Sequence, residues 1–394
     1  MKHIRIVLNP MEPYFLGSER SSRYGDSSQL SLTDPYYLIS EKLPSQTSLF
    51  GTLRFLGIRS PSTSFHLSPE DTKYIGNHSF RAESGFFSPG EFGTIRRISP
   101  LMLIHLSDNT LYVRAPVSHQ VKADNQINVY HRLVSAATAD GNRWLPQDYD
   151  HKAWKQYSWC AVNAASSTPF LEDSDLFETV DQVGVNLLER NSGHPGGFFK
   201  KQYVMLNKEY AFCYEAELDD EAFGETHGFT AKGCRLVTMG KGRSGFMASW
   251  DTIDEMTIPD ISPLLPKLPL LVDGKETETG CIAWCASDLL TSLKVGEIKK
   301  ECELLLGSSH QHRDFSTVYS SDDSLVKQSG RYKKSPAVLR LLGAGSVLYF
   351  RDTEQLAHFS QSLKMDSLFL HGKTVGWNSV YIVSKTGLKE VMEG

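Results

Sequence analysis

The sequence predicts an α+β protein, and three observations lead to that fold class. Short apolar runs that alternate with polar residues dominate the chain, and clusters of Gly, Ser, Pro and Asn separate them. Residues 3–8 predict an opening strand, because Ile4, Ile6 and Leu8 fall on one face. A long polar stretch and a short amphipathic helix follow. This order is typical of the start of a ferredoxin-like or RRM-like unit.

The other elements follow in chain order. Residues 17–33 are polar and Ser-rich, which predicts a long loop, and Gly57 predicts the end of the first helix. That helix has apolar residues at helical spacing, namely Leu49, Phe50, Leu53 and Leu56. Strand patterns recur at residues 111–114, 127–134, 182–187, 202–206, 210–217, 235–238, 281–285, 338–342, 347–350 and 380–383. A second helix is predicted at residues 353–363, and a polar surface loop at residues 310–330.

Length and composition limit the possible classes of protein. At about 150 residues per domain, 394 residues predict two domains. We expect them at residues 1–256 and 275–394, joined by a Pro/Leu-rich crossing at residues 258–274. No apolar run reaches the ~18–20 residues of a membrane span, and the N-terminus lacks a secretory pattern, so we expect a cytoplasmic location and no membrane partner.

Charge and cysteine content narrow the classes further. The formal net charge is −5, which argues against a protein that coats nucleic acid by bulk charge but leaves room for a local basic groove. Six cysteines in a chain of this length predict buried, reduced thiols rather than a disulfide framework.

Motifs of enzymes are weak in this sequence. Gly372-Lys373-Thr374 resembles the end of a phosphate-binding loop, but Ser367 stands where that loop needs a glycine. No serine has glycines two positions before and after it, and His310 and His312 lie in a polar stretch without a metal-binding helix. The sequence therefore predicts no catalytic set, no metal and no cofactor.

Four segments combine glycines with basic or aromatic residues. Glycine lets a backbone approach phosphate, arginine matches phosphate oxygens, and aromatic rings stack on unpaired bases. The four segments cover residues 13–24, 43–54, 237–246 and 327–350. Their combination predicts contacts with RNA.

The order of these segments resembles a known family. Pro13-Tyr14-Phe15 followed by Leu43-Pro44-Ser45-Gln46-Thr47 and Gly51-Thr52-Leu53-Arg54 is similar to the N-terminus of RAMP-superfamily CRISPR proteins. Gly343-Ala344-Gly345-Ser346 and Gly376-Trp377-Asn378 resemble the C-terminal glycine-rich loop and final strand of one branch. That branch is the third subunit of type III-B (Cmr) CRISPR effector complexes.

The resemblance implies a fold and a function. It implies two ferredoxin-like units with antiparallel sheets, long inserted loops and a β-hairpin thumb. The candidate for the thumb is residues 117–159, where basic residues and tryptophans are mixed. It implies a non-catalytic subunit that binds the 5′ handle of the CRISPR RNA and, through it, target RNA. It also implies docking on the polymerase-like large subunit and on backbone RAMP subunits.

The RNA-binding residues expected from this resemblance lie in all four segments. They are Arg20, Arg23, Ser45, Thr47, Gly51, Arg54, Lys241, Arg243, Lys333, Lys334, Gly343 and Gly345. The family has an arginine after its Phe-Phe pair where this chain has Leu16 and Gly17, so Arg20 or Arg23 is expected to substitute for it.

Two alternatives remain open. One is a RAMP endoribonuclease that cuts CRISPR precursor RNA without a metal, for which His66, His78 and Tyr74 would be the catalytic candidates. The other is the equivalent handle-binding subunit of another type III subtype, with the same chemistry and different partners.

Overall fold

The structure is a computed structural model, and it describes most of the chain. The described residues are 1–23, 36–58, 69–76, 80, 91–121, 127–129, 133–138, 141–146, 158–162, 168–185, 198–223, 229–240, 243–259, 261, 270–272, 275–277, 282–312, 315–316, 333–334, 338–350, 352–384 and 387–391. Within them the fold is α+β, with mostly antiparallel sheets and few helices, as the sequence predicts.

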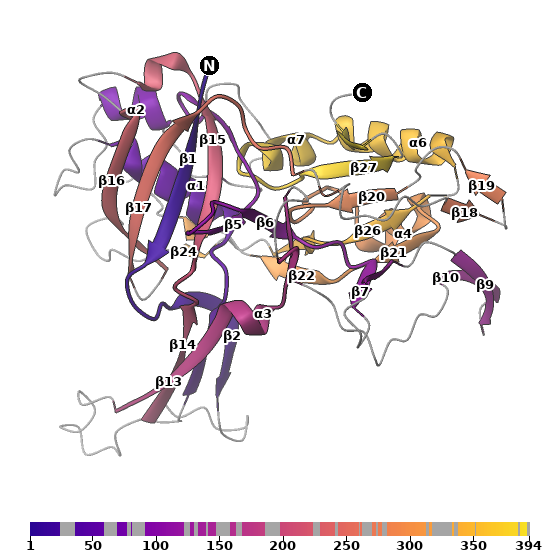
Figure 1. Ribbon diagram of the computed structural model, residues 1–394, viewed down its shortest axis with the longest axis horizontal. Helices are drawn as coiled ribbons and strands as arrows, with labels where there is room; N and C mark the ends of the chain where they lie inside the picture. The colour runs from indigo at the N-terminus through magenta and orange to yellow at the C-terminus, as the bar shows by residue number, and fades with distance from the viewer. Residues whose placement is uncertain are drawn as a thin grey trace.

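The largest element is a nine-stranded antiparallel sheet, seen on the left of Figure 1. In spatial order its strands are β12 (Phe170–Leu171), β11 (Trp159–Ala161), β6 (Leu111–Arg114), β5 (Met102–His105), β15 (Tyr210–Leu218), β1 (Lys2–Pro10), β17 (Ser244–Ile253) and β16 (Lys232–Met239), and β4 (Ile95–Ile98) pairs with β15 beside β5. The N-terminal strand β1 therefore lies between strands that come much later in the chain.

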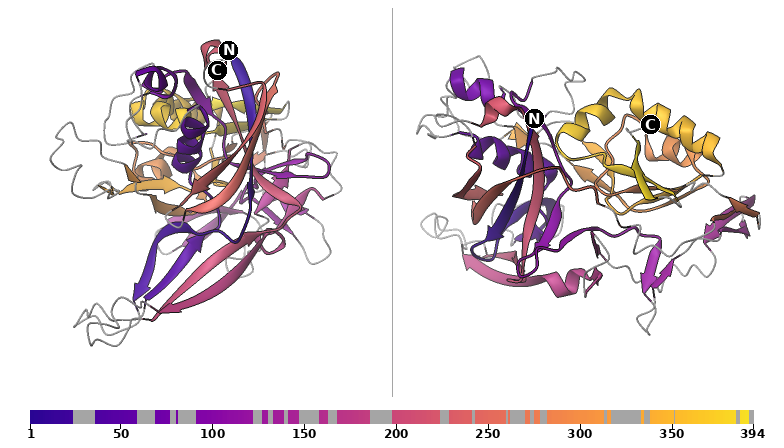
Figure 2. Two further views of the ribbon diagram at one scale, coloured as in Figure 1. Left: turned by 90° about the vertical axis from the view of Figure 1, so that its left-hand side faces the viewer. Right: turned by 45° about the horizontal axis from the view of Figure 1, so that its top comes forward.

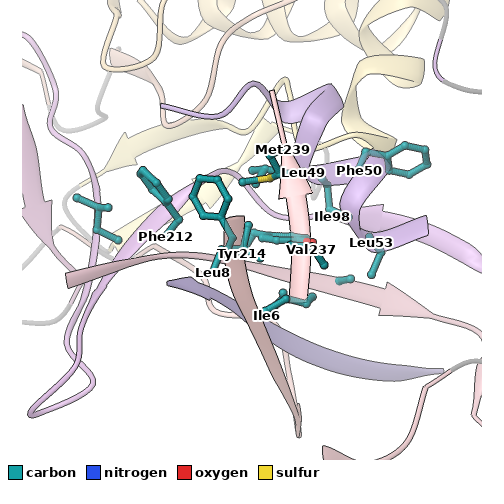
Figure 3. Close-up of a cluster of buried hydrophobic side chains, with 14 of the residues drawn as sticks. Ile6, Leu8, Leu49, Phe50, Leu53, Ile98, Phe212, Tyr214, Val237 and Met239 are labelled. Carbon is teal, nitrogen blue, oxygen red and sulfur yellow. The ribbon is translucent and has the colours of Figure 1, made fainter. Parts of the chain in front are cut away.

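Local patterns explain β1 and α1 (Gln46–Leu56). Alternation in β1 buries Ile4, Ile6 and Leu8 completely, and the helical spacing in α1 directs its apolar residues onto the same core. Figure 3 shows Leu49 and Leu53 of α1 beside side chains of β1, β15 and β16. Both elements were predicted, and the structure confirms them.

A five-stranded antiparallel sheet follows in the chain. Its spatial order is β21 (Leu304–Leu306), β26 (Val347–Tyr349), β20 (Ile282–Cys285), β27 (Val380–Ser384) and β28 (Gly387–Glu390). The helices of this part are α4 (Val295–Glu301), α6 (Thr353–Lys364) and α7 (Ser367–Thr374). The predicted helix at residues 353–363 is thus confirmed as α6, and the strand at residues 380–383 as β27.

The two sheets share a core. Met102, Ile104 and Val113 belong to the nine-stranded sheet, and they form one buried cluster with Trp284 and Tyr349 of the five-stranded sheet. One face of the larger sheet is therefore covered by α1 and part of the other face by the C-terminal residues. The strands of the larger sheet all lie before residue 254 and those of the smaller sheet after residue 281.

Gly345 connects the two sides of this junction through backbone hydrogen bonds. Its backbone nitrogen donates to the Cys285 carbonyl at 2.7 Å, and its carbonyl accepts from the Val117 nitrogen at 2.8 Å. Its φ is +87°, and a Cβ there would lie 2.6 Å from the Ala115 carbonyl oxygen. Only glycine fits such a left-handed position pressed against another backbone.

We therefore expect Gly345→Ala to lower the free energy of unfolding by more than the ~1–2 kcal/mol that the left-handed backbone alone costs an L-residue. Gly343→Ala is the matched control, because its φ is not left-handed and its Cβ would meet the rotatable Ser308 hydroxyl at 2.9 Å. Urea unfolding of both variants measures the difference. Equal losses in the two variants would contradict this account of the junction.

A separate four-stranded sheet projects from the body, as Figures 1 and 2 show. We call it the arm. Its spatial order is β13 (Phe177–Val185), β14 (Phe198–Leu206), β3 (Tyr36–Glu41) and β2 (Leu16–Arg23), with β3 parallel to β14 and the other pairs antiparallel. The short helix α3 (Asp173–Leu176) leads into β13.

The arm corrects two predictions. Residues 17–33 were predicted as a loop, but residues 17–23 lie in β2. Their polar sequence does not favour a strand, and pairing with β3 stabilises the strand conformation instead. The strand predicted at residues 182–187 is the end of the longer β13.

The remaining short strands pair two by two. They are β7 (His119–Val121) with β8 (Ile127–Val129), β9 (Leu133–Thr138) with β10 (Gly141–Pro146), β18 (Leu270–Val272) with β19 (Lys275–Thr277), β22 (Ser309–His312) with β25 (Leu339–Leu342), and β23 (Phe315–Ser316) with β24 (Lys333–Lys334). The single strand predicted at residues 127–134 is therefore two, and the loop predicted at residues 310–330 begins in β22. Residues 117–159, where we expect a thumb, hold the first two hairpins.

Candidate nucleic-acid interface

The first and third glycine and basic segments meet at the base of the arm, and the chain enters the second segment nearby. A Cβ on Gly240 would lie 2.5 Å from the Phe15 carbonyl oxygen, so the β16–β17 turn lies directly against the start of β2. The Phe15 nitrogen donates to the Ser244 hydroxyl at 2.8 Å. The Tyr14 hydroxyl donates to the Lys42 carbonyl at 2.6 Å, which brings the start of the second segment to the same place.

Two adjacent lysines of β14 lie on the arm in different surroundings. The Lys201 ammonium lies 4.1 Å from the centre of the Phe15 ring and 4.4 Å from that of Tyr203. The Lys200 ammonium lies 2.7 Å from an Asp181 carboxylate oxygen, and this hydrogen bond lowers the pKa of Asp181. Cations beside aromatic rings are a common feature of single-stranded nucleic-acid sites.

Sequence reasoning missed these lysines. The signal was present as Phe198-Phe199-Lys200-Lys201-Gln202-Tyr203, in which aromatic and basic residues lead into the strand predicted at residues 202–206. These six residues include no glycine, so they lie outside the four segments that combine glycine with basic residues.

The predicted basic residues of the first and third segments lie in or beside the arm. Arg20 and Arg23 are in β2, and Arg23 stands opposite Tyr36 of β3 in the strand register. Arg243 is exposed in the β16–β17 turn with φ 51°, and its nitrogen donates to the Gly240 carbonyl. Lys241 lies outside the described residues.

The start of α1 is occupied by its own hydrogen bonds. Ser45 is the N-cap, and its hydroxyl accepts from the Ser48 nitrogen at 3.2 Å and lies 3.2 Å from the Thr47 hydroxyl. The next side chain, Gln46, donates to the Gly376 carbonyl at 2.7 Å. Gly51 is exposed, and nothing lies within 4 Å of where its Cβ would be.

Arg54 holds two helices together. Its guanidinium donates to the Ile75 carbonyl at 2.8 Å and to the Gly76 carbonyl at 2.9 Å, at the end of α2 (Pro69–Ile75). The prediction that Arg54 faces RNA phosphate is not supported by this placement, because its donors are directed to backbone carbonyls.

The glycine loop of the fourth segment is buried at the junction of the two sheets. Gly343 and Gly345 are both buried, and the Gly343 nitrogen donates to the Ser308 carbonyl at 2.7 Å. This burial gives no support to their expected contact with RNA, because the loop packs against the backbone of other elements. Lys333 and Lys334 form β24, paired with β23.

A network of charges joins the arm to the body. Asp173 of α3 accepts from Lys42 at 3.1 Å and from the Trp159 indole nitrogen at 3.2 Å, and it lies 3.5 Å from Arg114. The Arg114 guanidinium lies 4.3 Å from the centre of the Trp159 ring. Burial would raise the pKa of Asp173, but Arg114 and Lys42 outweigh it and lower that pKa. Asp173 therefore stays charged and anchors the base of the arm.

A second pair lies at the junction of the two sheets. Nε2 of His310 lies 3.3 Å from Oδ2 of Asp288, and Asp288 also accepts from the Ala344 nitrogen at 2.8 Å. The hydrogen bond to Asp288 raises the pKa of His310 although burial opposes it. Burial would raise the pKa of Asp288, but the bond with His310 and the neighbouring Arg114 lower it overall.

The raised pKa of His310 and the lowered pKa of Asp288 define the pH range in which this pair stabilises the fold. The contribution of His310 to stability is complete below its unfolded pKa of about 6.5 and is lost as pH rises through its raised folded pKa. The contribution of Asp288 is complete above its unfolded pKa of about 3.9 and is lost as pH falls through its lowered folded pKa. We expect His310→Gln to destabilise the protein most near pH 5, below the unfolded pKa of histidine, and progressively less as pH rises through the raised folded pKa of His310, as measured by urea unfolding across pH. A difference in the free energy of unfolding between wild type and His310→Gln that does not change with pH would contradict the ion pair between His310 and Asp288.

Catalytic and metal-binding candidates gain no support. Among the described residues, no cluster of three His, Cys, Asp or Glu side chains has metal-site geometry. His66 and His78 lie outside the described residues, and Tyr74 is in α2, where its carbonyl accepts from Thr94. Likewise, none of the described helices is both long enough and apolar enough to cross a membrane.

Comparison with known proteins adds no relative. No protein-family model matches this chain, and no curated protein matches it significantly.

Proposed function

We propose that this protein is a non-catalytic RNA-binding scaffold and that single-stranded RNA binds at the arm and its base. The observation that carries this proposal is the contact of the first and third glycine and basic segments at Phe15, where residues 229 positions apart in the chain are hydrogen-bonded. Exposed Arg243 and Lys201 supply positive charge there, and the Phe15 and Tyr203 rings lie beside the Lys201 ammonium.

The sequence resemblance makes the proposal more specific. We propose that the RNA is the 5′ handle of a CRISPR RNA, with target RNA reached through it, in a type III effector complex such as Cmr. The partners would then be the polymerase-like large subunit and the backbone RAMP subunits. RNA-guided complexes leave sequence choice to base pairing, so such a subunit needs only local contacts with the RNA backbone. A net charge of −5 is compatible with that need.

The strand orders support two ferredoxin-like units. The C-terminal part runs β20, α4, β21, β26, α6 and β27 along the chain, and its spatial order β27-β20-β26-β21 is that of a βαββαβ ferredoxin-like sheet. The N-terminal part has the same antiparallel order in β15-β1-β17-β16, with α1 following β1. It departs from that plan because β15 precedes the β16–β17 hairpin in the chain.

A binding experiment tests the proposed function. We expect purified protein to bind an RNA that carries the CRISPR repeat handle more tightly than a scrambled RNA of equal length, with a steep dependence on salt. Arg243→Ala should reduce the salt slope, because its exposed guanidinium faces solvent at the arm base. Arg54→Ala is the matched control and should leave the slope unchanged, because its guanidinium binds carbonyls.

Three results would count against this function. Wild-type protein that binds neither RNA would refute RNA binding, and equal affinity for both would refute handle recognition. Specific cleavage of the repeat RNA in EDTA would refute the non-catalytic assignment. Copurification with a polymerase-like subunit from the source cells tests the complex separately.

A further inference from the structure

The two faces of the arm differ in chemistry, and the strand register defines them. Lys201 is paired with Gln182 of β13 and with Leu38 of β3, and Tyr203 stands opposite Val180. We call the surface formed by these five residues the Lys201 face. The neighbouring residues along each strand form the opposite face, which we call the Lys200 face, and they are Tyr37, Asp181, Val183, Lys200 and Gln202.

Charge is neutralised on the Lys200 face. Asp181 accepts from Lys200 at 2.7 Å and from the Gln202 amide at 3.2 Å. An incoming phosphate would have to compete with a carboxylate that already holds the ammonium. Exposed apolar surface does not distinguish the faces, because Val183 is 67% exposed on this side and Val180 is 37% exposed on the other.

Among the described residues, no carboxylate neutralises the charge on the Lys201 face. No carboxylate of the described part of the chain forms an ion pair with Lys201, whose ammonium lies over the Phe15 and Tyr203 rings. Ring contacts position an ammonium without cancelling its net charge. Tyr203 is partly exposed beside Val180, so this face presents a cation, an aromatic ring and an aliphatic side chain next to one another.

We infer that unpaired RNA binds the arm through the Lys201 face alone, with Lys201 at a phosphate and a base stacked on Tyr203. This inference rests on the proposed function and specifies its ligand as single-stranded rather than duplex RNA. In an A-form duplex the bases are stacked inside, so a flat strand surface cannot reach their faces. Single strands offer both phosphate and an open base to the same surface.

Adjacent residues of the same type allow a matched test. The probe is a fluorescent single-stranded uridine oligonucleotide of about 15 nucleotides, within the range of single-strand site sizes, compared with a duplex of equal length. We expect Lys201→Ala and Tyr203→Ala each to weaken binding of the single strand roughly tenfold, and Lys201→Ala to reduce the salt slope by about 0.7. Lys200→Ala and Tyr37→Ala should change affinity less than about twofold.

Two measurements guard against a folding defect. Lys201→Arg keeps the charge and should keep most of the affinity, while thermal unfolding of each variant shows whether the arm remains folded. Photocrosslinking of a 4-thiouridine probe, followed by mass spectrometry, should place the crosslink at Tyr203 rather than Tyr37.

The outcomes separate this inference from the proposed function. If wild-type protein binds no RNA, the proposed function itself is refuted. If wild-type protein binds RNA but the Lys200 and Tyr37 variants weaken it most, or if all four variants bind normally, the inference is overturned and the function stands. Equal affinity for the duplex probe would also overturn it, because stacking on Tyr203 requires an unpaired base.

Discussion

Replacing Arg5 with alanine is expected to lower the free energy of unfolding by about 3–5 kcal/mol, among the largest losses expected for a single charge. The Arg5 guanidinium donates to Oε1 of Glu215 through Nε at 3.0 Å and Nη2 at 2.8 Å. The Glu215 side chain is 0% exposed. Removing Arg5 leaves a buried carboxylate for which the nitrogen and hydroxyl of Thr257 are the remaining donors among the described residues.

A double variant separates the lost pair from the stranded charge. Arg5→Met combined with Glu215→Met removes both charges and should recover most of the stability that Arg5→Ala loses, because a buried ion pair adds little over apolar packing. Urea unfolding at neutral pH measures all three proteins. A double variant as unstable as Arg5→Ala would show that the loss comes from packing around β1 rather than from an unpaired carboxylate.

The contacts of Arg5 show which features of the fold local sequence patterns can predict. Alternation in β1 predicts the strand and the buried face of Ile4, Ile6 and Leu8, and both are observed. The same alternation puts Arg5 on the opposite face, and there Glu215 and Thr257 bind it from distant parts of the chain. Whether a second layer covers a strand depends on contacts between residues about 200 positions apart, which periodicity does not encode.

The arm shows the same limit for secondary structure. β2 contains the sequence LGSERSSR, which has no apolar alternation, and its strand conformation depends on pairing with β3. The predicted loop there was wrong for that reason. Helix α1 was predictable, because apolar spacing, the Ser45 cap and the following Gly57 are all local signals.

The candidate site was predictable only in part. Arg54 and Arg243 both follow a glycine within a few residues, so the sequence pattern predicts the same role, RNA binding, for both. In the fold one bonds to the carbonyls that end α2 and the other is exposed in a turn. Glycine is ambiguous in the same way, because the close approach it permits at Gly345 is to the Ala115 carbonyl rather than to a ligand.

Gly376-Trp377-Asn378 is another motif whose observed contacts differ from those expected from the sequence. Its Asn378 leads to the second large loss of stability that we expect. This segment contributed to the resemblance to RNA-binding proteins, but Asn378 is 0% exposed with φ 65°. Its Oδ1 accepts from the Leu290 nitrogen, and its Nδ2 donates to the Leu290 carbonyl at 2.8 Å and to the Phe369 carbonyl at 2.7 Å. One amide thus ties α7 to the residues that follow β20.

Asn378→Ala should therefore lower the free energy of unfolding by at least about 3 kcal/mol, since each buried polar group left without a partner costs about 1–3 kcal/mol. Asn378→Gly is the informative companion, because glycine accepts the left-handed backbone but makes none of the three hydrogen bonds. We expect Asn378→Gly to remain nearly as unstable as Asn378→Ala in urea unfolding. Recovery of wild-type stability in Asn378→Gly would instead assign the loss to backbone strain, and Asn378 would then be retained for its φ rather than for its amide.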